Sequence, residues 1–493
     1  MTPARPPRDP LRVVLISPKG PLYRHRGGVF GQTLRYMPLT LPTLAALIPD
    51  DVPVDLTCID EGIADVDLEI EADLVGMTVI TGSSMRAYEL AAHFRGRGIP
   101  VVLGGPHVTL VPEDAAPHAD SIVVGYAEES WPALLRDLAA GRMQARYDQK
   151  PDLDISASPL PDRSVLPRWR YLTADVFEAT RGCIHACDFC VVPSAWGRKP
   201  YQKPVEHIVE DIRRRRARRA IFIDLNIIAD REYAARLFEA LIPLRIQWFG
   251  LATTLLAYDL PLLDLAARSG CRGLLMGLES ISRTALRSSR KGFNNPEGYG
   301  EVVKRLHDRK IALQGCFVFG LDEDGPDVFR RTAEFAVDAR IDLPRFAILT
   351  PFPGTPLHAR LASEGRILTR DWSLYDGQHA VFQPALMDTK TLYEGTEAAW
   401  KSVYGVRNSW RRLRHTAAPP HVALLTNLGY RRYAHNLHRF YTCDAMVTPT
   451  WPRREAKPGR QPGPKPGPQP GPQQRPQPGP QSERPLPVVD RAP

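Results

Sequence analysis

Short apolar runs alternate with segments of helical spacing along the first third of the chain. The run LRVVLIS at 11–17 is rich in β-branched residues and stops at Pro18, which is typical of a buried strand. Similar runs follow at 74–80, 100–104 and 121–125, and helical spacing occupies 84–98 and 129–141. Over residues 10–142 this alternation predicts a Rossmann-like α/β domain, with a parallel sheet and helices on both faces.

Small and polar residues follow the predicted strands, at the edge where open parallel sheets bind ligands. They are Ser17, Pro18, Thr81, Gly82, Ser83, Gly104, Gly105, Pro106, His107, Gly125, Tyr126, Ala127 and Glu128. The sequence therefore predicts a ligand site at the carboxyl edge of this first sheet.

A second alternating series begins after an irregular stretch rich in Asp and Pro, which we assign as a linker over 143–174. Its predicted strands are 175–180, 220–224, 247–252, 273–278, 312–320 and 345–350, and its predicted helices are 204–219, 230–242, 259–269 and 296–310. Repeated βα units of this size predict a barrel over 175–357, complete or partial, with its active site at the carboxyl ends of the strands.

The remaining segments have a different composition. Residues 358–450 have helical and irregular patterns, and 451–493 are rich in Pro, Gly and Gln, which predicts a disordered, polyproline-like tail. That tail supplies +5 of the net charge of +9, so the rest of the chain is too weakly basic for a nucleic-acid footprint. No run approaches the ~20 apolar residues of a membrane span, and we expect a cytoplasmic protein without a nucleic-acid partner.

Three of the seven cysteines lie within eight residues, in the segment RGCIHACDFC directly after a predicted strand. Crowding of this kind indicates metal or redox chemistry rather than a disulfide scaffold. Most electron-transfer clusters take four cysteines. Three thiolates, from Cys183, Cys187 and Cys190, predict a [4Fe–4S] cluster with one iron left open for a substrate. A closed zinc site that includes His185, or three buried core cysteines, are the less favoured alternatives.

The cysteine spacing, with aromatic Phe189 just before the last cysteine, resembles the signature of the radical S-adenosylmethionine superfamily. This resemblance implies that the open iron binds S-adenosylmethionine and that its cleavage yields a 5'-deoxyadenosyl radical. It further implies that this cofactor is contacted by Phe189 in the cysteine loop, by Asp224 and Asn226 in FIDLN, and by Glu279 in MGLES. The alternative for Glu279 is a charge that stabilises a helix N-terminus.

The other four cysteines are predicted to be structural rather than ligands. They are Cys58, Cys271, Cys316 and Cys443. A buried free cysteine behaves as a small hydrophobic residue.

The first domain lacks G-x-G-x-x-G after its first strand, which counts against a dinucleotide. Its segments VVLGGPHVTL and VVGYAEES resemble the cobalamin-binding domain that precedes the barrel in one radical subclass. The resemblance implies a cobalamin site formed by Ser17, Thr81, Gly104, Gly105, His107, Thr109, Gly125 and Glu128. The motif Asp-x-His-x-x-Gly is absent, so no protein imidazole is expected below the cobalt. A simple tight turn at GGPH is the alternative.

The subclass resemblance implies methyl transfer to an unactivated carbon of a small molecule or lipid, with flavodoxin or ferredoxin as electron donor. Oxidation, cyclisation or ring rearrangement without methyl transfer is the alternative. Transfer-RNA methylthiolation is disfavoured because only Cys58 precedes Cys183, and a regulatory protein is disfavoured by the intact cysteine triad. The segment DWSLYDGQHAVFQP, with Trp372, Tyr375, Asp376 and His379, either contacts the substrate or forms a small core.

Overall fold

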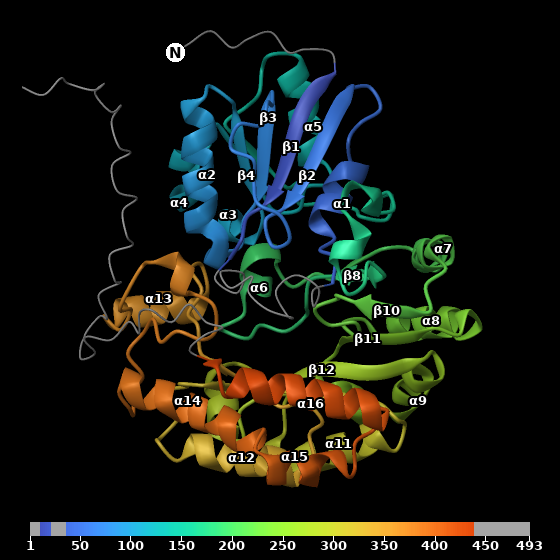
Figure 1. The fold of residues 1–493 in the computed structure, drawn as a ribbon, viewed down its shortest axis with the longest axis vertical. Helices are drawn as coiled ribbons and strands as arrows, with labels where there is room; N and C mark the ends of the chain where they lie inside the picture. Colours follow the sequence, from blue (N-terminus) through green and yellow to red (C-terminus); the bar gives the residue numbers. More distant parts are fainter. Residues whose placement is uncertain (1–9, 21–35, 438–493) are drawn as a thin grey trace, which may run out of the picture. The chain divides into compact units, whose positions relative to one another are not determined.

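The computed structural model describes residues 10–20 and 36–437 (Figure 1). Cys443 and the tail 451–493, for which disorder was predicted, lie outside these residues. Two six-stranded sheets dominate the described part of the chain. A two-stranded sheet of β8 (Thr180–Arg181) and β9 (Tyr201–Gln202) is inserted between the first two strands of the second sheet, β7 and β10.

The first sheet is parallel throughout, with the strand order β2-β1-β3-β4-β5-β6. Its strands are β1 (Leu11–Ser17), β2 (Val54–Asp60), β3 (Leu74–Thr78), β4 (Val101–Gly104), β5 (Ser121–Val124) and β6 (Arg146–Asp148). The order reverses beside β1, since β2 pairs with one edge of β1 and β3 with the other. Ligands of doubly wound sheets bind at such a switch point.

Helices cover both faces of this sheet. They are α1 (Thr40–Ala46), η2 (Thr81–Ser83), α2 (Ser84–Gly96), α3 (Pro106–Leu110), α4 (Pro112–Ala115), η3 (Ala116–His118) and α5 (Ser130–Ala139). Successive residues of β1 enter different cores, because side chains alternate across a strand. Val13 packs in one cluster with Leu41 of α1 and Leu134 of α5, whereas Val14 packs in the other with Leu90 of α2.

Two strands of this sheet were not anticipated from the sequence. β2 is an edge strand whose side chains alternate between half-buried and exposed, so it lacks the continuous apolar run of its neighbours. β6 lies inside the predicted linker, where only Tyr147 of its three residues is buried. The first domain therefore extends beyond residue 142, and the prediction of an irregular linker was wrong at this strand.

The second sheet is also parallel, with the order β14-β13-β12-β11-β10-β7. Its strands are β7 (Val176–Phe177), β10 (Arg219–Phe222), β11 (Gln247–Leu251), β12 (Cys271–Glu279), β13 (Ala312–Phe319) and β14 (Arg345–Ile348). Among the described residues, β7 and β14 do not pair with each other, so the barrel is partial. This confirms the α/β fold predicted from the sequence.

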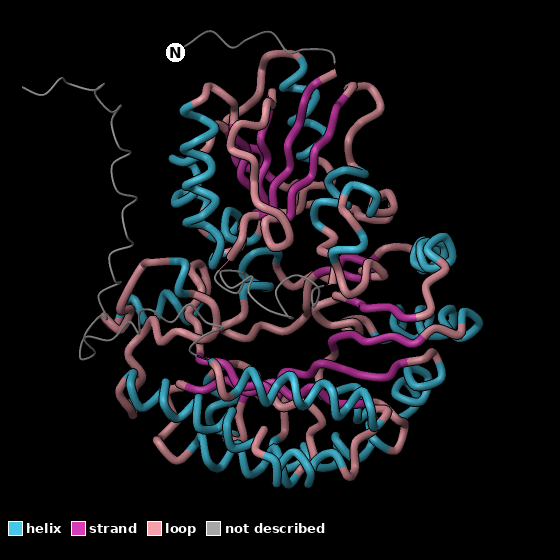
Figure 2. Tube along the Cα trace, in the orientation of Figure 1, coloured by secondary structure: helices cyan, strands magenta, loops and turns pink. Residues whose placement is uncertain are grey.

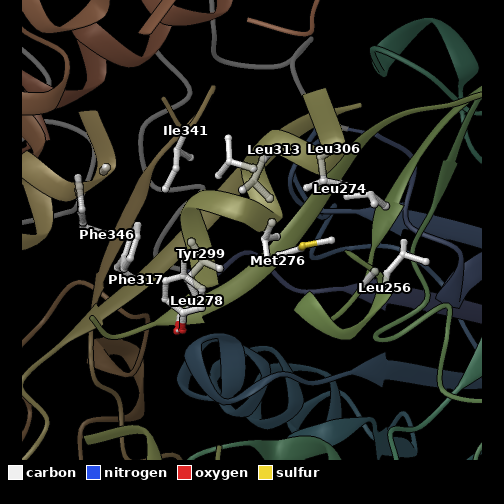
Figure 3. Close-up of a cluster of buried hydrophobic side chains, with 14 of the residues drawn as sticks. Leu256, Leu274, Met276, Leu278, Tyr299, Leu306, Leu313, Phe317, Ile341 and Phe346 are labelled. Atoms are coloured by element: carbon white, nitrogen blue, oxygen red, sulfur yellow. The ribbon is translucent and has the colours of Figure 1, made fainter. Parts of the chain in front are cut away.

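Helices follow the strands of the second sheet (Figure 2). They are α6 (Val191–Trp196), α7 (Val205–Arg215), α8 (Arg231–Leu241), η6 (Ile242–Leu244), η7 (Thr254–Tyr258), α9 (Leu260–Arg268), α10 (Arg283–Ser288), η8 (Pro296–Gly298), α11 (Tyr299–His307) and α12 (Val328–Asp338). Leu274, Met276 and Leu278 of β12 pack toward these helices with Tyr299 and Leu306 of α11 (Figure 3). The opposite, inner face of the sheet is left for the site.

The C-terminal region is helical, as predicted. It contains α13 (Pro356–Ser363), η9 (Trp372–Leu374), α14 (Thr389–Val403), α15 (Val406–Leu413) and α16 (Pro420–Ala434). Two further 3-10 segments, η4 (Arg163–Val165) and η5 (Arg168–Arg170), lie between β6 and β7. Trp400 of α14 donates a hydrogen bond to the carbonyl of Phe346, which attaches this helix to the edge strand β14. No helix within the described ranges combines the length and apolarity that a membrane span needs.

Candidate active site

The cysteine loop runs between β8 and α6. Gly182 precedes it with φ of 90°, and a Cβ there would lie 2.8 Å from the carbonyl oxygen of Lys199, so a glycine is needed at this turn. Cys183, Cys187 and Cys190 all have free thiols; Cys187 is buried and the other two are half-buried. The loop therefore presents three unpaired sulfur atoms just beyond a strand end.

The free thiols fit a cubane cluster better than a single ion. In the described part of the chain, no three His, Cys, Asp or Glu side chains converge on one metal position. A [4Fe–4S] cluster takes each thiolate on a different iron, so such convergence is not required. Burial raises the pKa of Cys187 to about 11, and the neighbouring cysteines add to this effect. A cationic iron would lower such a pKa and stabilise the thiolates.

His185 does not complete a zinc site. Its ring stacks on Phe293 with the centroids 3.9 Å apart, and its buried Nε2 has no hydrogen-bond partner. Burial lowers the pKa of this imidazole, with Lys291 and Arg198 adding to the effect. The structure thus gives no support to the zinc alternative.

A buried ion pair lies beside the cysteine loop. Lys291 Nζ is 2.5 Å from Glu279 Oε1, and each side chain is only 11% exposed. Glu279 ends β12 with φ of 64°, a left-handed conformation that a glutamate rarely adopts. Burial opposes the charge of Lys291, but Glu279 and the thiols of Cys187 and Cys190 raise its pKa. The pair therefore places one cation and one anion next to the sulfur atoms.

Lys291 was missed by the sequence reasoning. It lies 12 residues after Glu279, in the loop after α10, and no local pattern distinguishes it from a surface lysine. The only sequence signal is Gly277, where a Cβ would lie 2.1 Å from Glu279 Oε1 and 2.7 Å from Lys291 Nζ. A glycine two residues before a strand end is compatible with this pair, but does not reveal it.

The ends of β10 and β11 carry polar atoms without partners. Asn226 Oδ1 and Thr253 Oγ1 are buried and make no hydrogen bond within the described structure. Such orphaned atoms are expected where a polar ligand binds. Together with the Lys291–Glu279 pair, they fit the amino, carboxylate and hydroxyl groups of S-adenosylmethionine. The contact of Asn226 and Glu279 with this cofactor stays a prediction.

Asp224, predicted at the same site, is engaged by the protein itself. Its carboxylate accepts hydrogen bonds from the backbone N–H groups of Ala179 and Thr180 and from the Thr180 hydroxyl. Burial raises its pKa to about 6, and these hydrogen bonds oppose the rise. Asp224 thus fixes the strand that leads into the cysteine loop. Phe189 is half-buried, with Lys291 Nζ 5.9 Å from its ring centroid.

A cavity of about 300 Å³ lies between the carboxyl edge of the first sheet and the segments beside the cysteine loop. Of the eight residues predicted to bind cobalamin, Gly104, Gly105, Gly125 and Glu128 line this cavity. Leu15, Leu39, Leu44, Leu47, Trp131, Arg181, Trp196, Ile223 and Leu225 are among its other lining residues. Both sheets therefore contribute residues to one largely apolar cavity.

The other four predicted residues, Ser17, Thr81, His107 and Thr109, are not among the residues that line it. Thr109 ties two glycine loops together, since its hydroxyl donates to Gly105 O and accepts from Gly125 N–H. His107 is fully buried; its Nε2 is 3.0 Å from the Tyr88 hydroxyl and its Nδ1 is 3.3 Å from Thr81 Oγ1. The structure therefore gives His107 and Thr81 a hydrogen-bonding role behind the loops rather than a place in the cavity.

Charged and aromatic side chains join the two sheets at the cavity wall. Arg181 pairs with Glu128 of the first domain and with Glu178, and it lies over the ring of Tyr126 at 5.0 Å. Arg181, together with Lys203, lowers the pKa of Glu178 to about 2 although burial opposes this shift. This network holds the strand before the cysteine loop against the first domain.

Trp196 gives a second indication of which ligand fits the cavity. Its ring stacks on Tyr126 with centroids 5.2 Å apart, and its buried Nε1 has no hydrogen-bond partner. An unsatisfied donor in an apolar wall fits a large ligand with peripheral acceptors, such as the amide groups of cobalamin. The close approach of Gly105 to Val79, 2.8 Å for an added Cβ, also keeps this wall free of side chains.

The segment DWSLYDGQHAVFQP forms a small core, one of the two alternatives left open by the sequence. Trp372, Leu374, Tyr375 and Val381 pack together with Phe352. This core is attached to the first domain, because Trp372 donates a hydrogen bond to Asp114.

Two family models match the chain: the B12 binding domain over residues 37–135 and the radical SAM superfamily over 177–336. A similar curated protein is the bacteriochlorophyllide d C-12(1)-methyltransferase of Chlorobaculum tepidum, 30% identical over 380 residues that cover 75% of this chain and 82% of the relative. The bacteriochlorophyllide d C-8(2)-methyltransferase of the same organism is 30% identical over 397 residues, covering 74% of this chain and 86% of the relative.

Solved structures show the same fold. The radical S-adenosylmethionine methyltransferase TsrM from Kitasatospora setae, with cobalamin and a [4Fe–4S] cluster bound, matches with a TM-score of 0.61. The match covers 86% of this chain and 99% of TsrM at 16% identity. The order of the two domains and the helical C-terminal region are therefore shared features.

Proposed function

Because the chain belongs to the radical SAM superfamily, with a B12-binding domain ahead of its barrel, we propose that it C-methylates a cyclic tetrapyrrole of the bacteriochlorophyllide type. The protein is a cobalamin-dependent radical SAM enzyme acting on a small molecule. Its substrate class is proposed from the two relatives that resemble it over most of their length.

One observation carries the proposal. A single cavity is lined by the glycine loops of the B12-binding domain and by Arg181 and Trp196, which flank the cysteine loop. When bound, the cluster and S-adenosylmethionine supply a carbon-centred radical and cobalamin supplies a methyl group. Such chemistry depends on holding the reacting groups in one water-poor space, which a cavity shared by both domains provides.

The protein residues have positioning roles. Cys183, Cys187 and Cys190 would hold the cluster, and the Lys291–Glu279 pair beside them would orient S-adenosylmethionine by its charged and hydroxyl groups. Leu15, Leu39 and Trp131 exclude water from the cavity, since their side chains form its apolar wall. Neither the removal of a hydrogen atom by the radical nor the transfer of the methyl group needs a protein acid or base.

Reduction of the cluster needs an electron donor, and we assign this role to a flavodoxin or ferredoxin. Electron transfer between two proteins requires only a transient contact, which leaves no lasting interface in either partner.

The test uses the holoenzyme, reconstituted without oxygen with iron, sulfide and cobalamin. It is incubated with a chemical reductant, methyl-deuterated S-adenosylmethionine and bacteriochlorophyllide d, and the products are analysed by mass spectrometry. A product that is heavier by one labelled methyl group is expected, with 5'-deoxyadenosine formed beside it. The Cys187→Ala variant is the matched control and forms neither product.

Two outcomes contradict the proposal. If 5'-deoxyadenosine forms while the macrocycle loses hydrogen or gains a ring without label, the enzyme performs oxidation or cyclisation instead of methylation. If the macrocycle stays unchanged while the reductant and cofactors are competent, the substrate class is wrong.

A further inference from the structure

Arg345 begins β14, the edge strand of the partial barrel. The next residue, Phe346, is buried on the helix-covered side, where Trp400 lies edge-on to its ring with centroids 5.6 Å apart. Because side chains alternate along a strand, Arg345 leaves β14 on the inner face. Its paired neighbour in β13 is Cys316, which is half-buried.

Within the described residues, Arg345 forms no ion pair with an Asp or Glu. Its guanidinium also makes no hydrogen bond to these residues. The titratable groups that act on its charge are the thiol of Cys316 and the phenols of Tyr404, Tyr430 and Tyr433. Other arginines of this barrel do have acidic partners: Arg283 pairs with Glu297, and Arg309 with Asp264. An arginine is always charged, so Arg345 presents an uncompensated cation.

This cation lies close to the predicted radical site. Cys316 is in electrostatic reach of Arg345 and also of Glu279 and Lys291. The pair of Glu279 and Lys291 in turn reaches the thiols of Cys187 and Cys190. The strand register agrees with this order, since Cys316 is paired with Arg345 on one side and with Gly277, two residues before Glu279, on the other.

The inner face is accessible and partly apolar. Phe249 of β11 is 43% exposed although it lies within a central strand, and Arg345 is exposed as well. Tyrosine rings border the same region, since Gln314 of β13 donates to the Tyr430 hydroxyl of α16. An exposed aromatic side chain on β11 and a cation on β14, of the same sheet, complement an apolar molecule that is wide enough to reach both strands and carries an anionic group.

We propose that Arg345 is a substrate-binding residue that pairs with a carboxylate of the methyl acceptor, so that the substrate's apolar ring lies over the inner face toward the cysteine loop. This inference rests on the proposed function and narrows its substrate to carboxylate-bearing molecules. Arginine suits the role because its planar donors bind both carboxylate oxygens.

The test compares bacteriochlorophyllide d with its methyl ester, in which the carboxylate is neutralised. Binding of each to the cobalamin- and cluster-loaded enzyme is measured by equilibrium dialysis. The wild-type enzyme should bind the acid roughly tenfold to a hundredfold more tightly than the ester, the usual range for a charged hydrogen bond. Arg345→Gln should bind both alike, and Arg345→Lys should keep part of the preference.

Arg219→Gln is the matched control, because Arg219 begins β10 as an exposed residue in the same way that Arg345 begins β14. It should keep the preference for the acid. Formation of 5'-deoxyadenosine without a macrocycle should be unchanged in Arg345→Gln, which shows that the cluster site is intact.

The inference is overturned if the wild-type enzyme does not distinguish acid from ester, if Arg345→Gln keeps the preference, or if neither compound binds. Its failure is separable from that of the proposed function. Labelled methyl transfer to acid and ester alike would keep the function and reject the role of Arg345. If the preference for the acid depends on Arg345 but no methyl group is transferred, the role of Arg345 is kept and the proposed function is rejected.

Discussion

The indole N–H of Trp372 donates a hydrogen bond of 3.1 Å to a carboxylate oxygen of Asp114, a residue 258 positions earlier. The same oxygen accepts a bond of 2.7 Å from the Tyr88 hydroxyl and lies 3.1 Å from His107 Nε2. The small core around Trp372 is thereby attached to the B12-binding domain. This cluster connects the C-terminal region to the domain that holds cobalamin.

Trp372→Phe should destabilise this attachment. It keeps the aromatic packing but leaves one hydrogen bond unmade, at a cost of about 1 kcal/mol in the free energy of unfolding. Limited proteolysis should cut the segment around residue 372 sooner than in the wild type. Trp169→Phe is the control, since Trp169 is 73% exposed. Equal cleavage rates in both variants would show that the bond does not hold the segment.

His107 should make the stability fall in mild acid. Burial lowers its pKa, although Asp114 and Glu113 oppose this shift. Below a pH of about 6.5 the unfolded chain binds a proton that the folded chain refuses, so the free energy of unfolding falls by up to about 1.4 kcal/mol per pH unit until the lowered pKa is reached. Denaturation midpoints at pH 5.5 and 7.5 should converge in His107→Gln but not in the exposed His421→Gln. If the denaturation midpoint of His107→Gln differs between the two pH values as much as that of the wild type, His107 is not the cause.

Gly277→Ala should disturb the Lys291–Glu279 pair without touching the cysteines. The added Cβ would lie 2.1 Å from Glu279 Oε1, so the pair must move. We expect the iron content to persist and S-adenosylmethionine to bind at least roughly tenfold more weakly, as for loss of a charged hydrogen bond. Equilibrium binding and iron analysis measure both effects.

Gly429→Ala is the control for this variant, because nothing lies within 4 Å of a Cβ at that position of α16. It should bind S-adenosylmethionine as the wild type does and be slightly more stable, since alanine favours a helix. If Gly277→Ala binds S-adenosylmethionine as tightly as the wild type, the Lys291–Glu279 pair does not contribute to the cofactor site.

Trp196→Phe should weaken cobalamin binding without changing the free energy of unfolding. It removes the buried, unpartnered Nε1 donor of a residue that lines the cavity and keeps the stacking on Tyr126. The expected loss is roughly threefold to tenfold in affinity, the value of one neutral hydrogen bond. Titration with hydroxocobalamin, followed by absorbance, measures it.

Trp131→Phe provides the contrast, because its Nε1 already donates to the carbonyl of Leu44. This variant should lose stability, since a bond within the protein is broken. If both variants bind cobalamin equally to the wild type, the Trp196 donor is not directed at the ligand.

Single replacement of Cys183, Cys187 or Cys190 by Ala should abolish the broad cluster absorption near ~400 nm and the bound iron. Cys58→Ala should retain both, because Cys58 lies in the first domain and packs against its core. The readout is iron and sulfide per chain after anaerobic reconstitution. A full cluster in any triad variant would refute the assignment.

The sequence predicted the strands of the barrel within three residues at each end, because each is a short apolar run flanked by helical spacing. It missed β2 and β6, whose side chains are too exposed to form such a run. The cysteine triad was also evident from the sequence, since its three ligands lie on one loop. Local sites of this kind are encoded by spacing along the chain.

Other parts of the site depend on residues that are distant in the sequence. Lys291 contacts Glu279 across the helix α10, which separates the two residues in the sequence. His107 contacts Tyr88 and Asp114 in a buried cluster.

The sequence by itself thus determined the two parallel sheets, the cysteine loop and the glycine loops, because periodicity and spacing are local properties. Only the tertiary structure decided which side chains face the cavity and that Arg345, on the inner face, has no acidic partner among residues 10–20 and 36–437. The physical reason is that the direction and partners of a side chain depend on packing between elements far apart in the chain.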